Sequence, residues 1–222
     1  MTEKKNKSIF GRLQRTPKEK WKKEEFTEIE YEPTSVKELL TEMKDISELI
    51  IDLAYSAVLF NNEDISEEVK YLDVRMDKLN YEIRMTAMMA ARTKEDAEQL
   101  AGILQVAEAA ETISNAAGDI VNLLSKEKSG PILPKILKQA DEQLFRVMVS
   151  KDSNACDQQI GSLRVESETG MRIIAIRRGD FWIYNPGSET VIKADDWLIT
   201  RGTDEGFKEL NKFLTGKVGV LD

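Results

Sequence analysis

The sequence predicts an α+β protein, in which an N-terminal antiparallel three-helix bundle is followed by a small α/β sandwich domain. Between residues 35 and 125, apolar side chains recur at alternating intervals of four and three, which is the spacing of one helix face. After residue 143, apolar and polar residues alternate, which is typical of half-buried strands. The intervening segment 125–134 contains Ser129, Gly130, Pro131 and Pro134 and has the composition of a linker.

Polar residues mark the expected starts of the three helices. Ser35 and Glu38 have the spacing of a capping box, which satisfies free backbone amides at a helix start. Asp64 and Glu67 repeat this spacing after a break at two asparagines, and Thr93 precedes two acids that favour the positive end of the helix dipole. We expect the helices to end near residues 60, 90 and 125. Their apolar faces consist of Leu39, Met43, Ile46, Ile50, Leu53 and Ala57, then Ile65, Val69, Leu72, Met76, Leu79 and Ile83, and finally Leu100, Ile103, Ala107, Ala110, Ala117, Val121 and Leu124.

These three helices are expected to pack as a bundle, because turns of two or three residues hold consecutive helices antiparallel. The third helix has alanines and Gly118 on its apolar face, which allow a close approach of its neighbours. Three apolar faces of this width cannot all be covered inside the bundle, so some apolar surface stays exposed. We therefore expect the bundle to pair with a second copy, so that the protein is a homodimer.

The second module is expected to consist of short strands and a final helix. Residues 145–149 alternate as a half-buried strand would, and residues 172–176 are rich in β-branched side chains. Residues 181–184 follow across a Gly-Asp turn, which indicates a hairpin. Residues 197–201 predict another strand, and Thr203 is expected to cap a helix that runs to residue 214.

The lack of histidine and the single cysteine, Cys156, exclude several kinds of chemistry. Without histidine there is no Ser-His-Asp or Cys-His catalysis and no ordinary zinc site, so we expect no enzyme. A lone cysteine forms no intramolecular disulfide and fits the reducing cytoplasm. No run of about 18 uncharged apolar residues occurs, so we expect a cytoplasmic protein without a membrane span.

Charge is distributed unevenly along the chain. Residues 1–25 carry nine Lys or Arg against four Glu, a local charge of +5, whereas the whole chain carries −8. The acidic remainder disfavours binding to a nucleic acid polymer. The basic arm, residues 1–33, is expected to be a solvated tail, with contact to an anionic membrane surface or an acidic partner as the alternative.

Six short motifs in the second module have the order and spacing of a known family; they are Ile160-Gly161-Ser162-Leu163, Gly170 to Gly179, Asn185-Pro186, Val191-Ile192, Asp195-Asp196-Trp197-Leu198-Ile199 and Arg201-Gly202. Through these motifs the module resembles, over roughly residues 140–215, the C-terminal domain of TrkA/RCK-type potassium-transport regulators (RCK_C). One departure is Ala194-Asp195-Asp196, where the family usually has a glycine before the aspartate. We expect this change to affect a turn and not the core. No Gly-rich dinucleotide-binding loop occurs in the chain.

The third helix of the first module contains Glu111, Asn115 and Asp119 at intervals of four. This spacing is similar to the acidic pattern of the PhoU family, and the first module resembles one three-helix half of a PhoU domain over residues 36–125. The chain also resembles archaeal proteins that fuse a PhoU-like domain to an RCK_C domain. We accordingly divide it into the arm 1–33, the PhoU-like domain 34–125, a linker with a short helix over 126–142, and the C-terminal domain 143–216.

The resemblance to RCK_C domains implies a small-ligand site between two copies, for which cyclic di-AMP is the candidate ligand. The corresponding residues here are Leu163, Arg164, Arg172, Ile173, Ile174 and, more weakly, Asn185. The arginines can offer positive charge to phosphates. The alternative is that they are ordinary surface residues of a domain that serves only for dimerisation.

Carboxylates spaced four apart lie on one helix face and can bracket a cation. Three sets have this spacing: Glu48 with Asp52, Asp73 with Asp77, and Glu111 with Asn115 and Asp119. An oxygen-only set suits magnesium, calcium or manganese, whereas the PhoU resemblance implies iron or zinc clusters. We take Glu48, Asp52, Glu111, Asn115 and Asp119 as the candidate metal ligands, with a solvated helix face as the alternative.

These features together predict a non-catalytic, ligand-sensing regulatory subunit associated with potassium or other cation transport. The expected partners are a second copy, a membrane cation transporter or channel subunit that would hold the protein at the membrane periphery, and a small molecule. The alternative is a PhoU-like metal-binding protein of phosphate signalling, or a scaffold, in which the C-terminal domain serves only for assembly.

Overall fold

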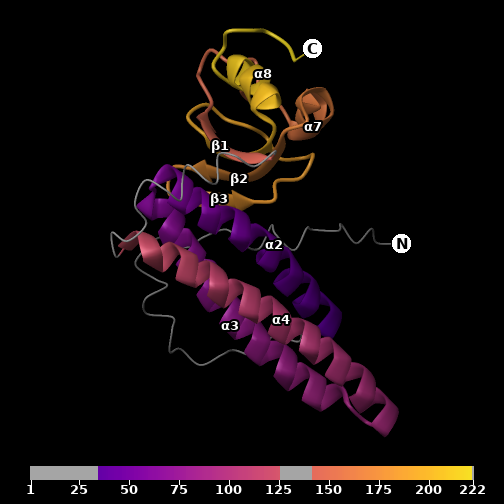
Figure 1. Cartoon of the computed structure of the whole chain (residues 1–222). Coiled ribbons are helices and arrows are strands. Elements are labelled where there is room, and N and C mark those ends of the chain that lie inside the picture. The colour runs from indigo at the N-terminus through magenta and orange to yellow at the C-terminus, as the bar shows by residue number, and fades with distance from the viewer. Residues whose placement is uncertain (1–34, 126–141, 222) are drawn as a thin grey trace, which may run out of the picture. The chain divides into compact units, whose positions relative to one another are not determined.

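The computed structural model describes residues 35–125 and 142–221, which fall into two compact units (Figure 1). The first unit contains three helices: α2 (Val36–Phe60), α3 (Glu63–Ala90) and α4 (Lys94–Ser125). The expected linker and short helix at 126–142 lie almost entirely outside the described residues, as does the basic arm. None of the described helices is long and apolar enough to cross a membrane.

The helices of the first unit begin where capping side chains satisfy free amides. Ser35 and Glu38 form the expected capping box, with Ser35 Oγ accepting from the Glu38 N–H at 3.2 Å. Thr93 caps α4 in the same way, since its Oγ1 accepts from the Asp96 N–H at 3.1 Å. The expected cap of α3 at Asp64 is wrong. Asn62 caps this helix instead, and its Oδ1 accepts from the Ile65 N–H at 3.0 Å.

All three helices contact one another, and their apolar faces meet in one core. The stripes of α2 and α3 are buried as the spacing predicts, from Leu39 to Ala57 and from Ile65 to Ile83. Helix α4 contributes small side chains, because Ala107, Ala110 and Ala117 are its buried residues along with Ser114, Gly118 and Val121. A Cβ at Gly118 would lie 3.0 Å from an Asp73 carboxylate oxygen, so this glycine permits the close contact of α4 with α3. The three-helix bundle is confirmed.

The second unit is a four-stranded antiparallel sheet with helices. Its strands occur in the order β1-β4-β2-β3. Its elements are β1 (Gln143–Met148), α6 (Ile160–Leu163), α7 (Val165–Thr169), β2 (Arg172–Arg178), β3 (Phe181–Tyr184), β4 (Trp197–Gly202) and α8 (Asp204–Leu214). The predicted strands, the hairpin between β2 and β3, and the final helix capped by Thr203 are all present. The α+β fold class is confirmed.

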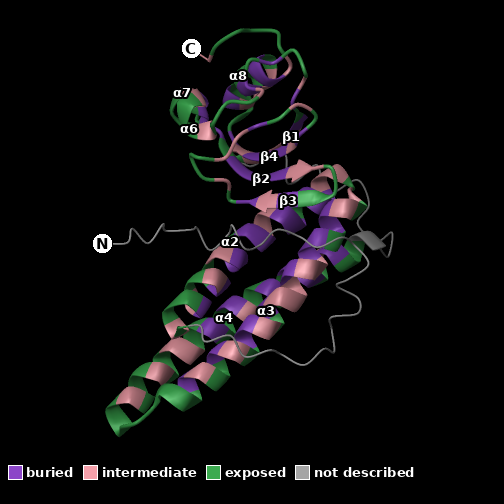
Figure 2. Cartoon of the chain, turned by 180° about the vertical axis from the view of Figure 1, so that it is seen from behind, coloured by how far each residue is buried: buried purple, intermediate pink, exposed green. Residues whose placement is uncertain are grey.

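The core of the second unit lies between the sheet and the helices α7 and α8 (Figure 2). Strand residues Val147, Ile173, Ile176 and Leu198 meet α8 residues there, and the rings of Phe145 and Phe207 stack with centroids 4.2 Å apart. The register of β2 against β4 shifts between Ile173 and Ala175, which is a β-bulge. A bulge places an extra residue in one strand, and this explains why the burial of β2 does not alternate.

Candidate ligand-binding site

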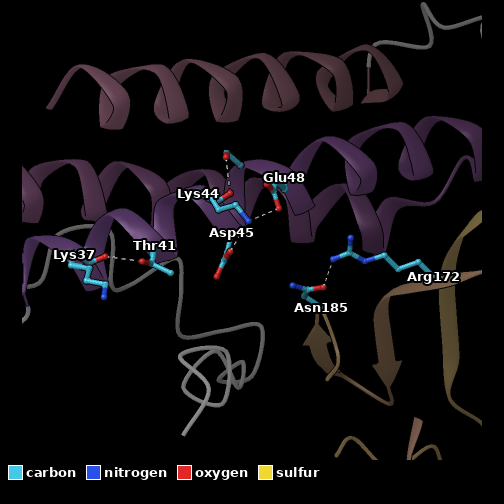
Figure 3. Close-up of polar contacts among 8 residues, drawn as sticks. Lys37, Thr41, Lys44, Asp45, Glu48, Arg172 and Asn185 are labelled. Atoms are coloured by element: carbon cyan, nitrogen blue, oxygen red, sulfur yellow. Dashed lines mark hydrogen bonds and ion pairs between the residues drawn. The ribbon is translucent and has the colours of Figure 1, made fainter. Parts of the chain in front are cut away.

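The predicted ligand residues Arg172 and Asn185 lie together at one end of the β2–β3 hairpin. Arg172 starts β2 and Asn185 follows β3, and an Arg172 guanidinium N–H donates to Asn185 Oδ1 at 3.0 Å (Figure 3). Asn185 has a φ of 41°, in the left-handed region, and its backbone N–H donates to the carbonyl of Ile174 at 2.9 Å. Asparagine adopts this conformation more readily than most residues. The backbone of the hairpin therefore fixes the side chain that positions Arg172.

The partner of Arg172 leaves its positive charge available. Asn185 is a neutral amide, so the hydrogen bond orients the guanidinium without neutralising it. Both side chains are exposed. An exposed, oriented guanidinium matches the oxygens of a phosphate or carboxylate group.

The predicted residues Ile173 and Ile174 have buried side chains, at 7% and 5% exposure. Ile173 packs in the core of the second unit. Neither side chain therefore presents a sizeable surface to solvent.

Leu163 and Arg164 lie in a separate groove of about 400 Å³. The groove is lined by Asn154, Gln158, Ser162, Leu163, Arg164, Glu168, Phe213, Gly219, Val220 and Leu221. Arg164 has a φ of 50° between the short helices α6 and α7, and its guanidinium forms an ion pair with Glu168 at 3.2 Å. An adjacent carboxylate reduces the attraction of this arginine for an anion. The six predicted ligand residues thus divide between a hairpin end and a groove, and the hairpin end offers the less neutralised cation.

The sequence reasoning missed an ion pair between Arg178 and Asp196. The Asp196 side chain is fully buried, and its two carboxylate oxygens accept from Arg178 Nε and Nη2, each at 2.8 Å. The backbone N–H of Lys193 donates to the same carboxylate at 2.8 Å, and Arg178 also donates to the Val191 carbonyl at 2.7 Å. The hydrogen bond to Asp196 raises the pKa of Arg178. This network ties the loop before β4 to the end of β2.

The residue before Asp196 explains the one departure from the family pattern. Asp195 has a φ of 66°, a conformation that glycine adopts without strain and aspartate tolerates. The substitution therefore lies in a turn, as expected. Its neighbour Asp196 belongs to the buried network.

In the helical unit, acidic side chains gather between α3 and α4. Ser114 Oγ donates to Asp73 Oδ1 at 2.7 Å, and the Asn80 amide donates to the Glu111 carboxylate. Burial raises the pKa of Asp77, and the negative charges of Asp73 and Glu111 raise it further. Hydrogen-bond donors from the protein therefore satisfy part of this acidic region.

The other predicted metal ligands are more scattered. Glu48 is exposed and forms an ion pair with Lys44 at 2.8 Å, one turn earlier on α2 (Figure 3). Asp52 is half-buried, whereas Asn115 and Asp119 are exposed on α4. Within residues 35–125 and 142–221, no three His, Cys, Asp or Glu side chains lie close enough together to hold a metal ion. Metal binding by these residues stays a prediction.

The fold and these sites define a protein of two modules, one a three-helix bundle with an acidic α3–α4 seam and the other a small sheet domain with an oriented surface arginine. Residues 40–124 match the PhoU domain, and residues 144–215 match the TrkA-C domain. The chain thus contains two separate regions, one matching each of these two family models. Both resemblances that the sequence suggested are confirmed.

Individual relatives match parts of the chain. A probable potassium channel protein 2 of Methanocaldococcus jannaschii is 28% identical over 79 residues, which are 36% of this chain and 23% of that protein. The chain therefore spans less than a quarter of that relative's length.

Two solved structures from S. agalactiae are also similar. The RCK_C domain dimer of BusR in complex with c-di-AMP is 26% identical, with 35% of this chain and 96% of that chain covered and a TM-score of 0.33. BusR in complex with its busA-promotor DNA is 21% identical, with 55% and 67% covered and a TM-score of 0.32. The expected absence of a nucleic-acid partner stays a prediction.

Proposed function

We propose that the chain is a non-catalytic regulatory subunit of potassium transport whose TrkA-C domain senses a small phosphate-containing ligand. The observation that carries this proposal is the exposed Arg172, oriented by Asn185 at the hairpin end of a TrkA-C domain. The similarity of part of the chain to a probable potassium channel protein supports the link to potassium transport. The protein acts as a homodimer in the cytoplasm, next to a membrane transporter or channel subunit.

The ligand class follows from the chemistry of Arg172. A guanidinium held by a neutral partner binds a phosphate through two parallel N–H groups, and such charge-assisted hydrogen bonds contribute about 1.5–3 kcal/mol each. The amide nitrogen of Asn185 has donors of its own when its oxygen accepts from Arg172. A cyclic dinucleotide, with two phosphates, can engage one Arg172 from each of two copies. We take cyclic di-AMP as the first ligand to test.

Calorimetric titration with cyclic di-AMP, and with AMP and ATP as controls, tests the proposal. We expect saturable binding at one ligand per two chains, and Arg172→Ala should weaken it at least about tenfold, the loss of one charged hydrogen bond. Arg164→Ala is the matched control, because this arginine lies in the groove and is paired with Glu168. If Arg164→Ala weakened binding more than Arg172→Ala, the ligand site would lie in the groove. If no nucleotide released heat on titration, the chain would not be a nucleotide sensor.

A second candidate function, metal binding by the PhoU domain, is favoured by the acidic side chains of Asp73, Asp77 and Glu111 where α3 contacts α4, although they would have to move closer together to hold an ion. Carboxylates that repel one another gain free energy when a cation enters between them. Elemental analysis of protein purified without chelator, followed by titration with Mn²⁺, tests it. Asp77→Asn should lower the affinity for Mn²⁺, with Glu63→Gln, an exposed acid at the start of α3, as the control.

A further inference from the structure

Helix α4 has a second apolar stripe that points away from the bundle. We call it the outer stripe; it consists of Gly102, Val106, Ala109, Ile113, Ala116, Ile120 and Leu123. These residues recur at strictly alternating intervals of four and three. Six of the seven are exposed, with exposed fractions of 55% for Val106, 38% for Ile113 and 41% for Leu123, and Ile120 is half-buried.

The outer stripe differs from the face of α4 that packs in the bundle. That inner face consists of Ala107, Ala110, Ser114, Ala117 and Val121, all buried. The outer stripe is the inner face shifted by one residue, so on a helix of 3.6 residues per turn the centres of the two stripes are about 100° apart. Helix α4 therefore presents one apolar face to α2 and α3 and a second to its surroundings.

A solvated helix face normally has charged side chains, and the outer stripe has none over about six turns. On α2 the exposed positions include Lys37, Lys44 and Glu48, which is the usual pattern. Large apolar residues repeated along one helix face with the period of seven are typical of a helix–helix contact.

Gly102 supplies a second observation. It lies inside α4, where glycine is the poorest helix former after proline. A Cβ built at Gly102 would have no neighbour within 4 Å, so nothing in the described chain requires the missing side chain. The close approach of another helix outside this chain would require it.

We propose that the outer stripe is the surface through which two copies of this chain pair, with α4 antiparallel to α4 of the second copy. This proposal deepens the homodimer of the proposed function by naming its surface in the PhoU domain. From Gly102 to Ile120 the stripe alternates small and large residues, with Gly102, Ala109 and Ala116 each followed by Val106, Ile113 and Ile120 in turn; Leu123, at the end of the stripe, lies outside these layers. In an antiparallel pair each large residue meets a small one; the layers are Val106 with Ala116, Ile113 with Ala109, and Ile120 with Gly102.

A second copy fits the stripe better than an unrelated helix, because the pattern is complementary to itself. Layers of one large and one small residue have similar volumes and fill the contact evenly. A parallel pair in register would place Ile113 against Ile113 and Ala109 against Ala109, which gives alternating wide and thin layers. The volumes therefore select the antiparallel orientation, in which the same patch serves both copies.

Charges beside the stripe permit the same orientation. The flank away from the inner face includes Gln105, Thr112 and Asp119. In the antiparallel register above, Gln105 lies opposite Asp119 of the second copy and Thr112 lies opposite its own counterpart. No two like charges meet among these positions.

Disulfide trapping of the full chain tests the proposal. In a Cys156→Ser background, Thr112→Cys should form a disulfide-linked dimer at low protein concentration under mild oxidation. A mixture of chains bearing Gln105→Cys and Asp119→Cys, one of them with a tag to change its mass, should form the mixed dimer. Asn115→Cys, exposed on the other side of α4, is the matched control and should stay monomeric on a denaturing gel.

Two further variants separate pairing from folding. Ile113→Glu combined with Thr112→Cys should reduce the cross-linked fraction at least about tenfold, because it places two charges in the central layers. Gly102→Leu should raise the melting temperature of the bundle and yet weaken pairing, since leucine favours the helix but blocks the contact. Ala101→Leu, an exposed neighbour off the stripe, should leave pairing unchanged.

Equal cross-linking of the Asn115→Cys control, or none with Thr112→Cys, would overturn the proposal. Cross-linking of Gln105→Cys only with itself would overturn the antiparallel orientation. Light scattering on the uncrosslinked chain distinguishes this failure from failure of the proposed function. If light scattering gave the mass of a dimer but Thr112→Cys formed no disulfide, the copies would pair through another surface. The nucleotide titration tests the proposed function independently of this result.

Discussion

Removal of the Asp196 carboxylate should destabilise the TrkA-C domain without affecting the helices of the PhoU domain. This side chain is fully buried and accepts three hydrogen bonds, two from Arg178 and one from the Lys193 N–H, each at 2.8 Å. Asp196→Ala leaves both donors without their acceptor and leaves the charge of Arg178 without its partner.

The magnitude follows from burial. Breaking a buried ion pair by removal of one partner costs about 3–5 kcal/mol. The Arg178 side chain is 31% exposed, so its guanidinium recovers part of its hydration after the substitution. We therefore expect the lower end of the range, about 3 kcal/mol. With an m-value of about 1 kcal/mol per molar of urea for a small domain, the midpoint of unfolding falls by about 3 M.

In a Trp21→Phe background, tryptophan fluorescence reports on this domain alone, because the other two tryptophans, Trp182 and Trp197, lie in β3 and β4. Far-ultraviolet circular dichroism reports mainly on the long helices α2, α3 and α4. Urea unfolding of Asp196→Ala should shift the fluorescence transition and leave the main dichroism transition in place.

The matched control is Asp195→Asn, one residue earlier. Asp195 is exposed, its ion pair with Lys151 at 3.5 Å is a surface pair, and asparagine tolerates its positive φ. Such a pair contributes about 0–1 kcal/mol. If Asp196→Ala and Asp195→Asn shift the fluorescence midpoint equally, the buried network does not hold the loop before β4 and the reasoning is wrong.

Three further predictions concern single side chains. Thr200→Val should stabilise the TrkA-C domain by about 1 kcal/mol in urea unfolding, because the buried Thr200 hydroxyl has no hydrogen-bond partner among the described residues; destabilisation would contradict this. Because the pKa of Asp77 is raised in the folded bundle, the folded bundle binds a proton more readily than the unfolded chain. The bundle should therefore become more stable as the pH falls from the raised pKa of the folded state to the ordinary pKa of the unfolded state, about 3.9. Asp77→Asn should flatten this dependence in thermal melts and stabilise the bundle slightly at neutral pH, and an unchanged pH profile would refute it. Burial, followed by Asp157 and other nearby acids, raises the pKa of Cys156, so native protein should react with a disulfide reagent more slowly than urea-unfolded protein at neutral pH; equal rates would count against this.

Local sequence signals were sufficient for most element boundaries. Ser35 with Glu38 is a capping box in sequence and in structure, and Thr93 caps α4 as expected, with the Asp96 side chain also accepting from the Thr93 N–H. The start of α3 was predicted two residues late, because Asp64 and Glu67 have the same spacing as a cap and its acid. Asn62 takes the cap, and Asp64 then lies in the first turn, where its charge favours the helix dipole.

The short helices α6 and α7 were not predicted. They have four and five residues, too few for a helical period to appear in the sequence. Their junction at Arg164 has a positive φ, which only the fold determines. The predicted ligand residues were consequently assigned to one stretch, although the fold places Arg164 in a groove and Arg172 at a hairpin end.

The most important polar contact also lacked a sequence signal. Arg178 and Asp196 are 18 positions apart, and no spacing rule connects the end of one strand with the turn before another. The resemblance to the family marked Asp196, but burial alone distinguishes it from its exposed neighbour Asp195. Similarly, the outer stripe of α4 could be read in the sequence only after the structure had assigned the inner face to the bundle.

Potassium flux in host cells that lack this chain tests the central claim most directly. Cells would be complemented with the native chain, with Arg172→Ala or with Arg164→Ala, and the response of flux to the level of cyclic di-AMP would be measured. The account predicts that the native chain and Arg164→Ala restore a ligand-dependent flux and that Arg172→Ala does not. Flux that is the same with and without the chain, at every ligand level, would contradict a regulatory role in potassium transport.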